Sequence, residues 1–364
     1  MGSKHIIIDA RELRSSTGRY MERLLHHLQA IDHDNHYTVL LKPRDLAGWQ
    51  PDSPNFTPLA CPYAEFGFGE QLGFKRQLDG LKADLVHFGM TQQPVRYHGK
   101  AVTTIHDLTT LRFTNPDKNR LVFALKQQVY KHVVKRVAHK SAAIITPSQF
   151  VKDDLVKFAE VDPDKIMVTY EAAEAITDVP EAATGLEGHQ FLVYVGRPTP
   201  HKNLDRLIEA FVALKATHPD LLLVLVGQKD ANYERIETEV RQRTIKNVVF
   251  TGYVSEGRLR WLYENCAAYV FPSLSEGFGL PGLEAMVHGA PVVASNATCL
   301  PEIYGEAAHY FDPLNVTAMA DAINEVLTDK ALRQGLVEAG RRQAKKYSWK
   351  RMAEQTLEVY NLVT

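Results

Sequence analysis

"AAYVFPSLSEGFGLPGLEAMVHGAPVVAS", residues 267–295, decides the fold because it contains two strand-like runs and a helix between them. Apolar residues fill 267–271, a helix is predicted from Pro281, and a second apolar run follows at 291–295. Two apolar strands joined by a helix form a parallel βαβ unit whose sheet is covered on both faces. The stretch therefore predicts an α/β fold.

The same alternation continues in both directions along the chain. Further strands are predicted at 5–9, 37–41, 84–88, 101–105, 142–146, 165–170, 191–195, 221–226 and 247–251. Helices are predicted at 18–31, 69–81, 119–139 and 149–159, after Asn203, after Ser255 and beyond Asn315. The pattern predicts two doubly wound, Rossmann-like parallel-sheet domains that face each other across a cleft. We place them at 1–173 and 191–346, joined by a linker at 174–190.

Composition agrees with two soluble domains and excludes several classes of protein. The chain has 364 residues, of which 45% are hydrophobic and 23% are charged. Its apolar runs are too short to cross a bilayer, and its start does not resemble a signal peptide. The three cysteines are too scattered to suggest disulfides or a zinc site, so we expect a cytoplasmic protein. The net charge of −1 and the acidic second half argue against a nucleic-acid partner.

Residues 118–140 form the most basic part of the chain. They contain seven Lys or Arg and no Asp or Glu. Leu121, Leu125, Val129, Val133 and Val137 recur at helical spacing, which predicts an amphipathic basic helix. One hypothesis is that the helix holds the protein at an anionic membrane surface. The alternative is a solvated helix face.

Glu276 and Glu284 flank the glycine-rich loop of the opening stretch. Ligands of open α/β sheets bind beyond the carboxyl ends of the strands, and this loop follows such a strand. A carboxylate can accept two hydroxyl hydrogen bonds, which suits a sugar diol, and the amides of Phe278, Gly279 and Leu280 could face an anion. Alternatively, a glutamate in the first turn of a helix only complements the helix dipole.

Three other segments carry candidate site residues at expected strand ends. "YVGRPTPHKNLDRLIEAF", 194–211, places Gly196, Arg197 and Lys202 before a helix, an arrangement that fits a diphosphate but also describes a solvated loop. His106 and Asp107 end a strand in "TTIHDLT", although a lone histidine is often structural. Gly18 precedes a helix in "RSSTGRYMERLL", which alone is weak evidence.

These motifs resemble the family 4 nucleotide-sugar glycosyltransferases, which are retaining enzymes of the GT-B fold. The resemblance rests on "EGFGLPGLEA", "GRPTPHKN", "TIHDLT", "STGRY", "TPSQFVKDDL", "PEIYGEAAHYFDP" and "YSWKRMAEQ", and extends from about residue 5 to residue 360. Within the family the chain is most similar to the mannosyltransferase-B-like group, which builds bacterial surface polysaccharides. The resemblance implies that the C-terminal helix, 347–364, crosses back to the first domain.

The resemblance also implies a role for each matching residue. Glu276 would contact the transferred sugar and His106 would lie at the reacting centre, so both are the catalytic candidates, with Asp107 on the acceptor side. Glu284 would hold the donor ribose. The remaining donor-binding residues would be Gly18, Gly196, Arg197, Lys202, Tyr253, Val254, Leu259, Phe278, Gly279 and Leu280.

The implied reaction moves a hexose, best guessed as mannose from GDP-mannose, to a saccharide or lipid-linked acceptor. Cations and helix amides can stabilise a departing diphosphate, so we expect no metal and no cofactor. The Asp-x-Asp formed by Asp162 and Asp164 lies in a predicted turn. Two alternatives remain open: a nucleotide-sugar epimerase of the same fold, and a non-catalytic module that binds the nucleotide sugar.

Overall fold

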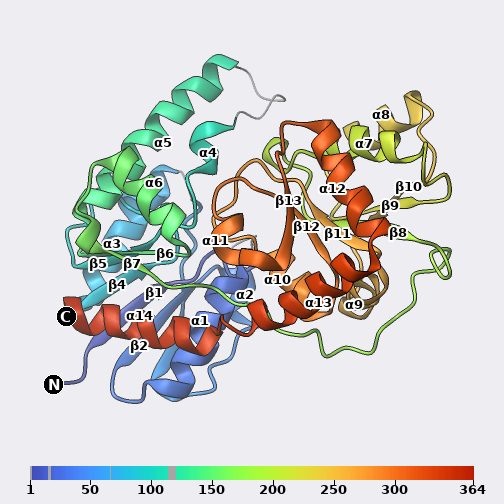
Figure 1. The fold of residues 1–364 in the computed structure, drawn as a ribbon. Coiled ribbons are helices and arrows are strands. Elements are labelled where there is room, and N and C mark those ends of the chain that lie inside the picture. Colours follow the sequence, from blue (N-terminus) through green and yellow to red (C-terminus); the bar gives the residue numbers. More distant parts are fainter. Residues whose placement is uncertain (1, 15–17, 66, 114–119) are drawn as a thin grey trace. The chain divides into compact units, whose positions relative to one another are not determined.

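The computed structural model describes residues 2–14, 18–65, 67–113 and 120–364 (Figure 1). The chain divides into two compact units. Unit 1 comprises Met1–Arg112, Lys118–Glu171 and Ser348–Thr364, and unit 2 comprises Phe113–Asp117 and Ala172–Tyr347. Each unit is a parallel sheet flanked by helices, and each is described by itself below.

The sheet of unit 1 has seven strands in the order β3-β2-β1-β4-β5-β6-β7, and all neighbouring strands are parallel. The strands are β1 His5–Asp9, β2 His36–Leu41, β3 Phe56–Ala60, β4 Leu85–Phe88, β5 Ala101–Thr104, β6 Ala143–Thr146 and β7 Ile166–Val168. Buried apolar clusters form the core of the unit; Ile7, Phe74 and Phe88 belong to one, and Ile105, Ile144 and Leu155 to another. The order reverses between β1 and β4, the kind of switch point at which such sheets bind ligands.

Most helices of unit 1 lie between residues 18 and 165, and one more comes from the C-terminal segment. They are α1 Gly18–Ile31, α2 Pro43–Leu46, the π-helix η1 Glu70–Phe74, α3 Lys75–Leu81, α4 Thr109–Arg112, α5 Arg120–Lys140, α6 Gln149–Ala159, the 3₁₀ turn η2 Pro163–Lys165 and α14 Trp349–Val363. The last helix, α14, packs against α1 (Figure 1). Its Tyr360 hydroxyl lies 2.6 Å from Nδ1 of buried His87 on β4. The C-terminal segment is therefore part of unit 1.

The sheet of unit 2 has six parallel strands in the order β10-β9-β8-β11-β12-β13. The strands are β8 Phe191–Val195, β9 Leu222–Val226, β10 Val248–Gly252, β11 Ala268–Phe271, β12 Val292–Ser295 and β13 Ala308–Phe311. The helices are η3 Pro200–Lys202, α7 Leu204–Leu214, α8 Ala231–Gln242, α9 Glu256–Asn265, α10 Leu280–Val287, α11 Leu300–Tyr304, η4 Gly305–Ala307, α12 Val316–Thr328 and α13 Lys330–Ala344. Here the switch point lies between β8 and β11.

The predicted class, two doubly wound parallel-sheet domains, is confirmed. The sequence pattern did not predict β3 or β13, and both are edge strands. Edge strands are paired on one side only and tolerate proline, which occurs as Pro58 within β3. Their short, partly exposed sequences lack the continuous apolar run that marks the central strands.

Two expectations need correction. The segment 174–190 belongs to unit 2: Ile176 N donates to His288 Nε2 (3.0 Å) and Glu181 N donates to Gly257 O (3.1 Å). The apolar stripe expected along the basic helix also differs, because Val129 is 57% exposed. A strict four-residue spacing rotates around a helix of 3.6 residues per turn. Val137 of the expected stripe is buried, and Val134 and Ala138 are buried beside it. Residues 118 and 119 of that helix lie outside the described residues.

Candidate functional site

The loops that follow β8 and β11 lie side by side at the carboxyl edge of the second sheet. Their strands are neighbours, and two sets of hydrogen bonds join the loops themselves. Leu274 N donates to His201 O (2.7 Å), and buried Asn203 donates from Nδ2 to Pro272 O (3.0 Å). The first half of the predicted site, 196–203, is therefore fixed against the second half, 272–279.

Lys202 and Glu276 meet where these loops touch. Lys202 Nζ lies 2.6 Å from Glu276 Oε1, and the two side chains are 18% and 11% exposed. Arg197, in the same loop as Lys202, is exposed. The sequence predicted these residues separately, and the structure brings the lysine and the glutamate together. An ammonium beside a carboxylate offers donors to a phosphate and acceptors to sugar hydroxyls at adjacent positions.

Helix α10 carries the second glutamate of the opening stretch. The helix begins at Leu280, its N-cap Gly279 has φ +88°, and Glu284 is buried. Glu284 is thus the fifth residue of the helix and not in its first turn, which corrects our expectation and weakens the helix-dipole interpretation, since that effect is confined to the first turn. Phe278 is also buried, with its ring against Tyr347.

Other predicted donor-binding residues lie at the ends of β8 and β10. Gly196 has φ +151°, a conformation that favours glycine, and a Cβ on it would lie 2.8 Å from the Tyr194 hydroxyl. After β10, Tyr253 is 82% exposed, Val254 is nearly buried, and Leu259 is half-buried in the first turns of α9. Their contact with a nucleotide base stays a prediction.

In unit 1, His106 follows β5 and has oxygen acceptors at both ring nitrogens. Nε2 lies 3.0 Å from Gly89 O, and Nδ1 lies 3.4 Å from Glu171 Oε1. Burial alone lowers the pKa of His106, but the hydrogen bond and negative charge of Glu171, with Gly89 O and Asp107, outweigh it and raise that pKa above its usual value. Asp107 accepts a hydrogen bond from Thr109 N (2.7 Å). The roles of both residues in catalysis stay predictions.

Gly18 is the first residue of α1 and is buried. A Cβ at this position would lie 2.1 Å from the carbonyl oxygen of Leu13. Glycine is therefore required at this position because the chain passes close to its own backbone at Leu13. Contact with phosphates stays a prediction, and residues 15–17 of the predicted loop lie outside the described residues.

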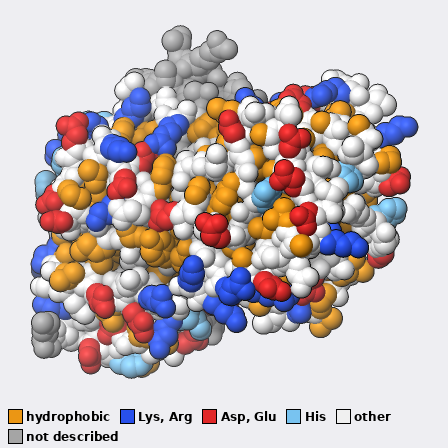
Figure 2. Space-filling model, in the orientation of Figure 1, with side chains coloured by type: hydrophobic (Ala, Val, Ile, Leu, Met, Phe, Trp, Pro, Cys, Tyr) orange, Lys and Arg blue, Asp and Glu red, His pale blue; other side chains and the backbone are white. Residues whose placement is uncertain are grey.

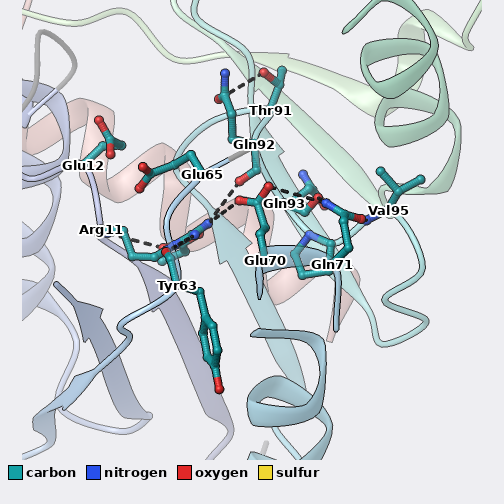
Figure 3. Close-up of polar contacts among 12 residues, drawn as sticks. Arg11, Glu12, Tyr63, Glu65, Glu70, Gln71, Thr91, Gln92, Gln93 and Val95 are labelled. Carbon is teal, nitrogen blue, oxygen red and sulfur yellow. Dashed lines mark hydrogen bonds and ion pairs between the residues drawn. The ribbon is translucent and has the colours of Figure 1, made fainter. Parts of the chain in front are cut away.

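Sequence reasoning missed a buried arginine at the carboxyl edge of the first sheet. The Arg11 guanidinium bonds both carboxylate oxygens of Asp9 (2.9 and 2.8 Å) and Glu70 Oε1 (3.1 Å), as well as the carbonyls of Tyr63 and Gln92 (Figure 3). It is 2% exposed and lies 4.2 Å from the ring centroid of Phe74. Burial lowers the pKa of Arg11, but the two carboxylates outweigh it and raise that pKa. One side chain thus joins the loops after β1, β3 and β4.

A second charged cluster lies beside this arginine. Lys42 Nζ is 2.5 Å from Glu12 Oε1 and 2.9 Å from Glu65 Oε1. Burial, and then the neighbouring Glu65, raise the pKa of Glu12. Nothing in the sequence pattern signalled either cluster, because their members are far apart along the chain.

The described part of the chain has neither a membrane-spanning helix nor a metal-binding group of three or more His, Cys, Asp or Glu. Asp162 and Asp164 are exposed, and Asp162 accepts a hydrogen bond from Asp164 N (2.9 Å) within their turn. Basic and acidic side chains are intermingled on the face shown in Figure 2.

Two family models match the chain, one in each half. The model described as "Glycosyltransferase Family 4" matches residues 17–173, and "Glycosyl transferases group 1" matches residues 180–343. The second match contains the Lys202–Glu276 pair and Glu284.

Curated relatives carry related names. The chain is 32% identical to O-antigen chain mannosyltransferase B of Escherichia coli over 280 residues, which cover 72% of this chain and 71% of the relative. It is 28% identical to the serotype-specific mannosyltransferase WbdA of Escherichia coli over 233 residues, 60% of this chain. That match spans only 28% of the length of WbdA.

Solved structures share the fold at low sequence identity. Sucrose-phosphate synthase from Thermosynechococcus elongatus superposes with a TM-score of 0.78 at 20% identity, covering 99% of this chain and 98% of the other. Anabaena HepE, solved in complex with UDP-glucose, gives a TM-score of 0.75 at 15% identity, covering 98% and 99%. These likenesses support the GT-B fold.

Proposed function

Since the chain belongs to the family 4 glycosyltransferases, we propose that it transfers a hexose from a nucleotide sugar to a hydroxyl of a saccharide or lipid-linked acceptor. The observation that carries the proposal is the Lys202–Glu276 pair at the switch point of the second sheet. A cation and a carboxylate 2.6 Å apart suit the two adjoining parts of one donor, its diphosphate and its sugar.

We assign the donor-binding roles within unit 2 as follows. Lys202 and exposed Arg197 balance the charge of the diphosphate, and Glu276 accepts hydrogen bonds from the transferred sugar. Glu284 accepts hydrogen bonds from the ribose hydroxyls. The buried side chain of Phe278 leaves its backbone amide as the group that contacts the donor.

The proposed chemistry retains the configuration of the transferred sugar and needs no metal. The acceptor oxygen forms a bond to the anomeric carbon as the bond from that carbon to the phosphate oxygen breaks. The acceptor's proton passes to the departing phosphate, so the products are a glycoside and a nucleoside diphosphate. The stabilisation of the departing charge is assigned to Arg197, Lys202 and the amides before α10.

Mannose from GDP-mannose is the donor we favour, because the relative with 32% identity is named a mannosyltransferase of O-antigen chains. The same name supports a place in the synthesis of a bacterial surface polysaccharide.

Thermal unfolding in the presence of UDP, GDP, ADP and dTDP tests the donor assignment. A nucleotide at 100 times its dissociation constant should stabilise the folded protein by about 2.7 kcal/mol. We expect GDP to raise the melting temperature of the wild type and to have a much smaller effect on Glu284→Ala. Stabilisation by another nucleotide would correct the base, and the absence of stabilisation by all four would contradict the proposed function.

Product analysis separates transfer from the two alternatives. A transferase releases nucleoside diphosphate and lengthens the acceptor, in excess chelator as well as without it. An epimerase converts the donor to an isomer without acceptor, and a binding module leaves the donor unchanged. Loss of transfer in chelator, restored by manganese, would contradict metal independence.

We further propose that α5 holds the protein at the inner face of the cell membrane. Lys126, Lys135 and Arg136 are exposed on this helix, and each cation near an anionic surface contributes about 1 kcal/mol. Sedimentation with anionic and with neutral liposomes tests the proposal. Equal binding to both, or to neither, would leave α5 as a solvated helix.

A further inference from the structure

Thr298 has a backbone conformation that is unusual for a β-branched residue. Its φ is +55°, in the left-handed region. It occupies the first central position of a turn closed by a bond from Leu300 N to Ala297 O (3.3 Å), and the second central residue, Cys299, has φ −80° and ψ −9°. A positive φ at the first central position is a feature of the primed turn types, in which Gly, Asn and Asp are preferred. A threonine here is strained, and the surrounding structure must hold it in place.

The side chain of Thr298 makes a contact that glycine could not make. Its Oγ1 accepts a hydrogen bond from the backbone N–H of Glu276 (3.1 Å). The next residue, Cys299, donates from Sγ to the carbonyl of Glu276 (3.3 Å). Because the carboxylate of Glu276 is bonded to Lys202, the glutamate is held at three points, two of which come from the turn at 298–299.

We propose that Thr298 is a positioning residue for sugar transfer, whose hydroxyl fixes the backbone of Glu276 and so aims its carboxylate at the transferred sugar. The inference rests on the proposed function only in assigning Glu276 to that sugar. Strained backbone is characteristic of functional sites, where it is kept for a contact that a relaxed residue does not provide. Small displacements of a positioned group cost large factors in rate, so the hydroxyl should affect turnover.

Three substitutions at Thr298, made in the full chain, separate the hydroxyl from the strain. Thr298→Gly removes both, Thr298→Ala removes the hydroxyl but keeps a Cβ at positive φ, and Thr298→Ser keeps the hydroxyl. Thr244→Gly is the matched control, because Thr244 has φ +56° and is exposed after α8. It relieves the same kind of strain away from the site.

The first readout is hydrogen exchange at the Glu276 amide, which does not depend on activity. We expect exchange to be about tenfold faster in Thr298→Gly and Thr298→Ala, the factor that corresponds to a lost hydrogen bond of about 1.4 kcal/mol. Thr298→Ser and Thr244→Gly should exchange at the wild-type rate. Thr298→Gly should melt above Thr298→Ala, because glycine adopts positive φ without strain.

The second readout is the kinetics of transfer. We expect kcat to fall about tenfold in the Gly and Ala variants with little change in KM for the donor, and to stay within about twofold of wild type in the Ser variant. Wild-type kcat in Thr298→Gly, or an equal loss in the Ser and Ala variants, would overturn the inference. If the wild type transfers no sugar from any donor, the proposed function fails, and amide exchange alone decides whether Thr298 holds Glu276.

Discussion

At the scale of single residues, the contact with Glu171 favours the charged form of His106 and raises its pKa. Both ring nitrogens of His106 face oxygen acceptors, and only the imidazolium can donate from both. We expect Glu171→Gln to lower the pKa of His106, which an NMR titration of the imidazole can measure. Glu209→Gln on the exposed face of α7 is the control.

The same pair makes stability depend on pH in a defined direction. The folded pKa of His106 is raised, so its contribution is fully present below the unfolded value of about 6.5 and is lost as pH rises through the folded pKa. The difference in melting temperature between wild type and Glu171→Gln should therefore be largest at low pH and shrink on raising it. A difference that stays constant from pH 6 to pH 9 would contradict the pairing.

Loss of the Arg11 guanidinium should destabilise unit 1 strongly. Arg11→Met leaves Asp9 and Glu70 as buried carboxylates without their cation, and breaking a buried pair in this way costs about 3–5 kcal/mol. Urea denaturation should show this loss, and Arg76→Met, at an exposed position, should show almost none. A loss below about 1 kcal/mol would mean that the loops after β1, β3 and β4 are held by other contacts.

At the scale of elements, the start of α10 depends on two glycines packed against Tyr304. The Tyr304 hydroxyl donates to Gly279 O (2.5 Å), and a Cβ on Gly282 would lie 2.2 Å from that hydroxyl. Gly282→Ala should therefore displace the start of α10, lower the melting temperature and weaken stabilisation by the donor nucleotide. Tyr304 is the last residue of α11, so its side chain links the end of α11 to the start of α10.

Gly335→Ala is the matched control for that substitution. Gly335 is exposed within α13, and a Cβ there meets no atom within 4 Å. Alanine in an exposed helix interior is favoured over glycine by about 1 kcal/mol, so this variant should melt at or above the wild-type temperature. If both variants melted alike, the contact with Tyr304 would not constrain α10.

The helices and strands also show how much of the fold could be predicted from the sequence. The central strands and α1, α5 and α6 were predicted to within one or two residues, because continuous apolar runs and 3.6-residue periodicity are local signals. Lys202 and Glu276 were each predicted as site residues from the motifs around them, but their pairing became known only from the structure. Three features could not be predicted from the sequence. The Arg11 cluster and Glu171 act through partners that are distant in sequence. Thr298 acts through a positive φ, which is unusual for threonine.

At the scale of the whole molecule, unit 1 is discontinuous in sequence and is completed by the last helix. The side chains that α14 buries are those of Trp349, Met352, Ala353, Thr356, Val359 and Tyr360. Tyr360 also supplies a partner to His87, whose pKa is lowered to about 3 by burial and, second, by His106, so that its ring is neutral near pH 7. Unit 2 consists mainly of the segment Ala172–Tyr347, to which the short segment Phe113–Asp117 is added.

Deletion of residues 349–364 should therefore affect the two units unequally. Unit 1 should lose protection from hydrogen exchange, because α1 and His87 lose their packing, whereas unit 2 should stay folded and still be stabilised by the donor nucleotide. Transfer should be lost. Tyr360→Phe, which keeps the ring and removes only the hydroxyl, should cost about 1–3 kcal/mol, the usual penalty for a buried polar group left without its partner. Full protection of unit 1 in the truncated chain would show that α14 only covers the unit, and loss of protection in unit 2 would show that the two units fold as one.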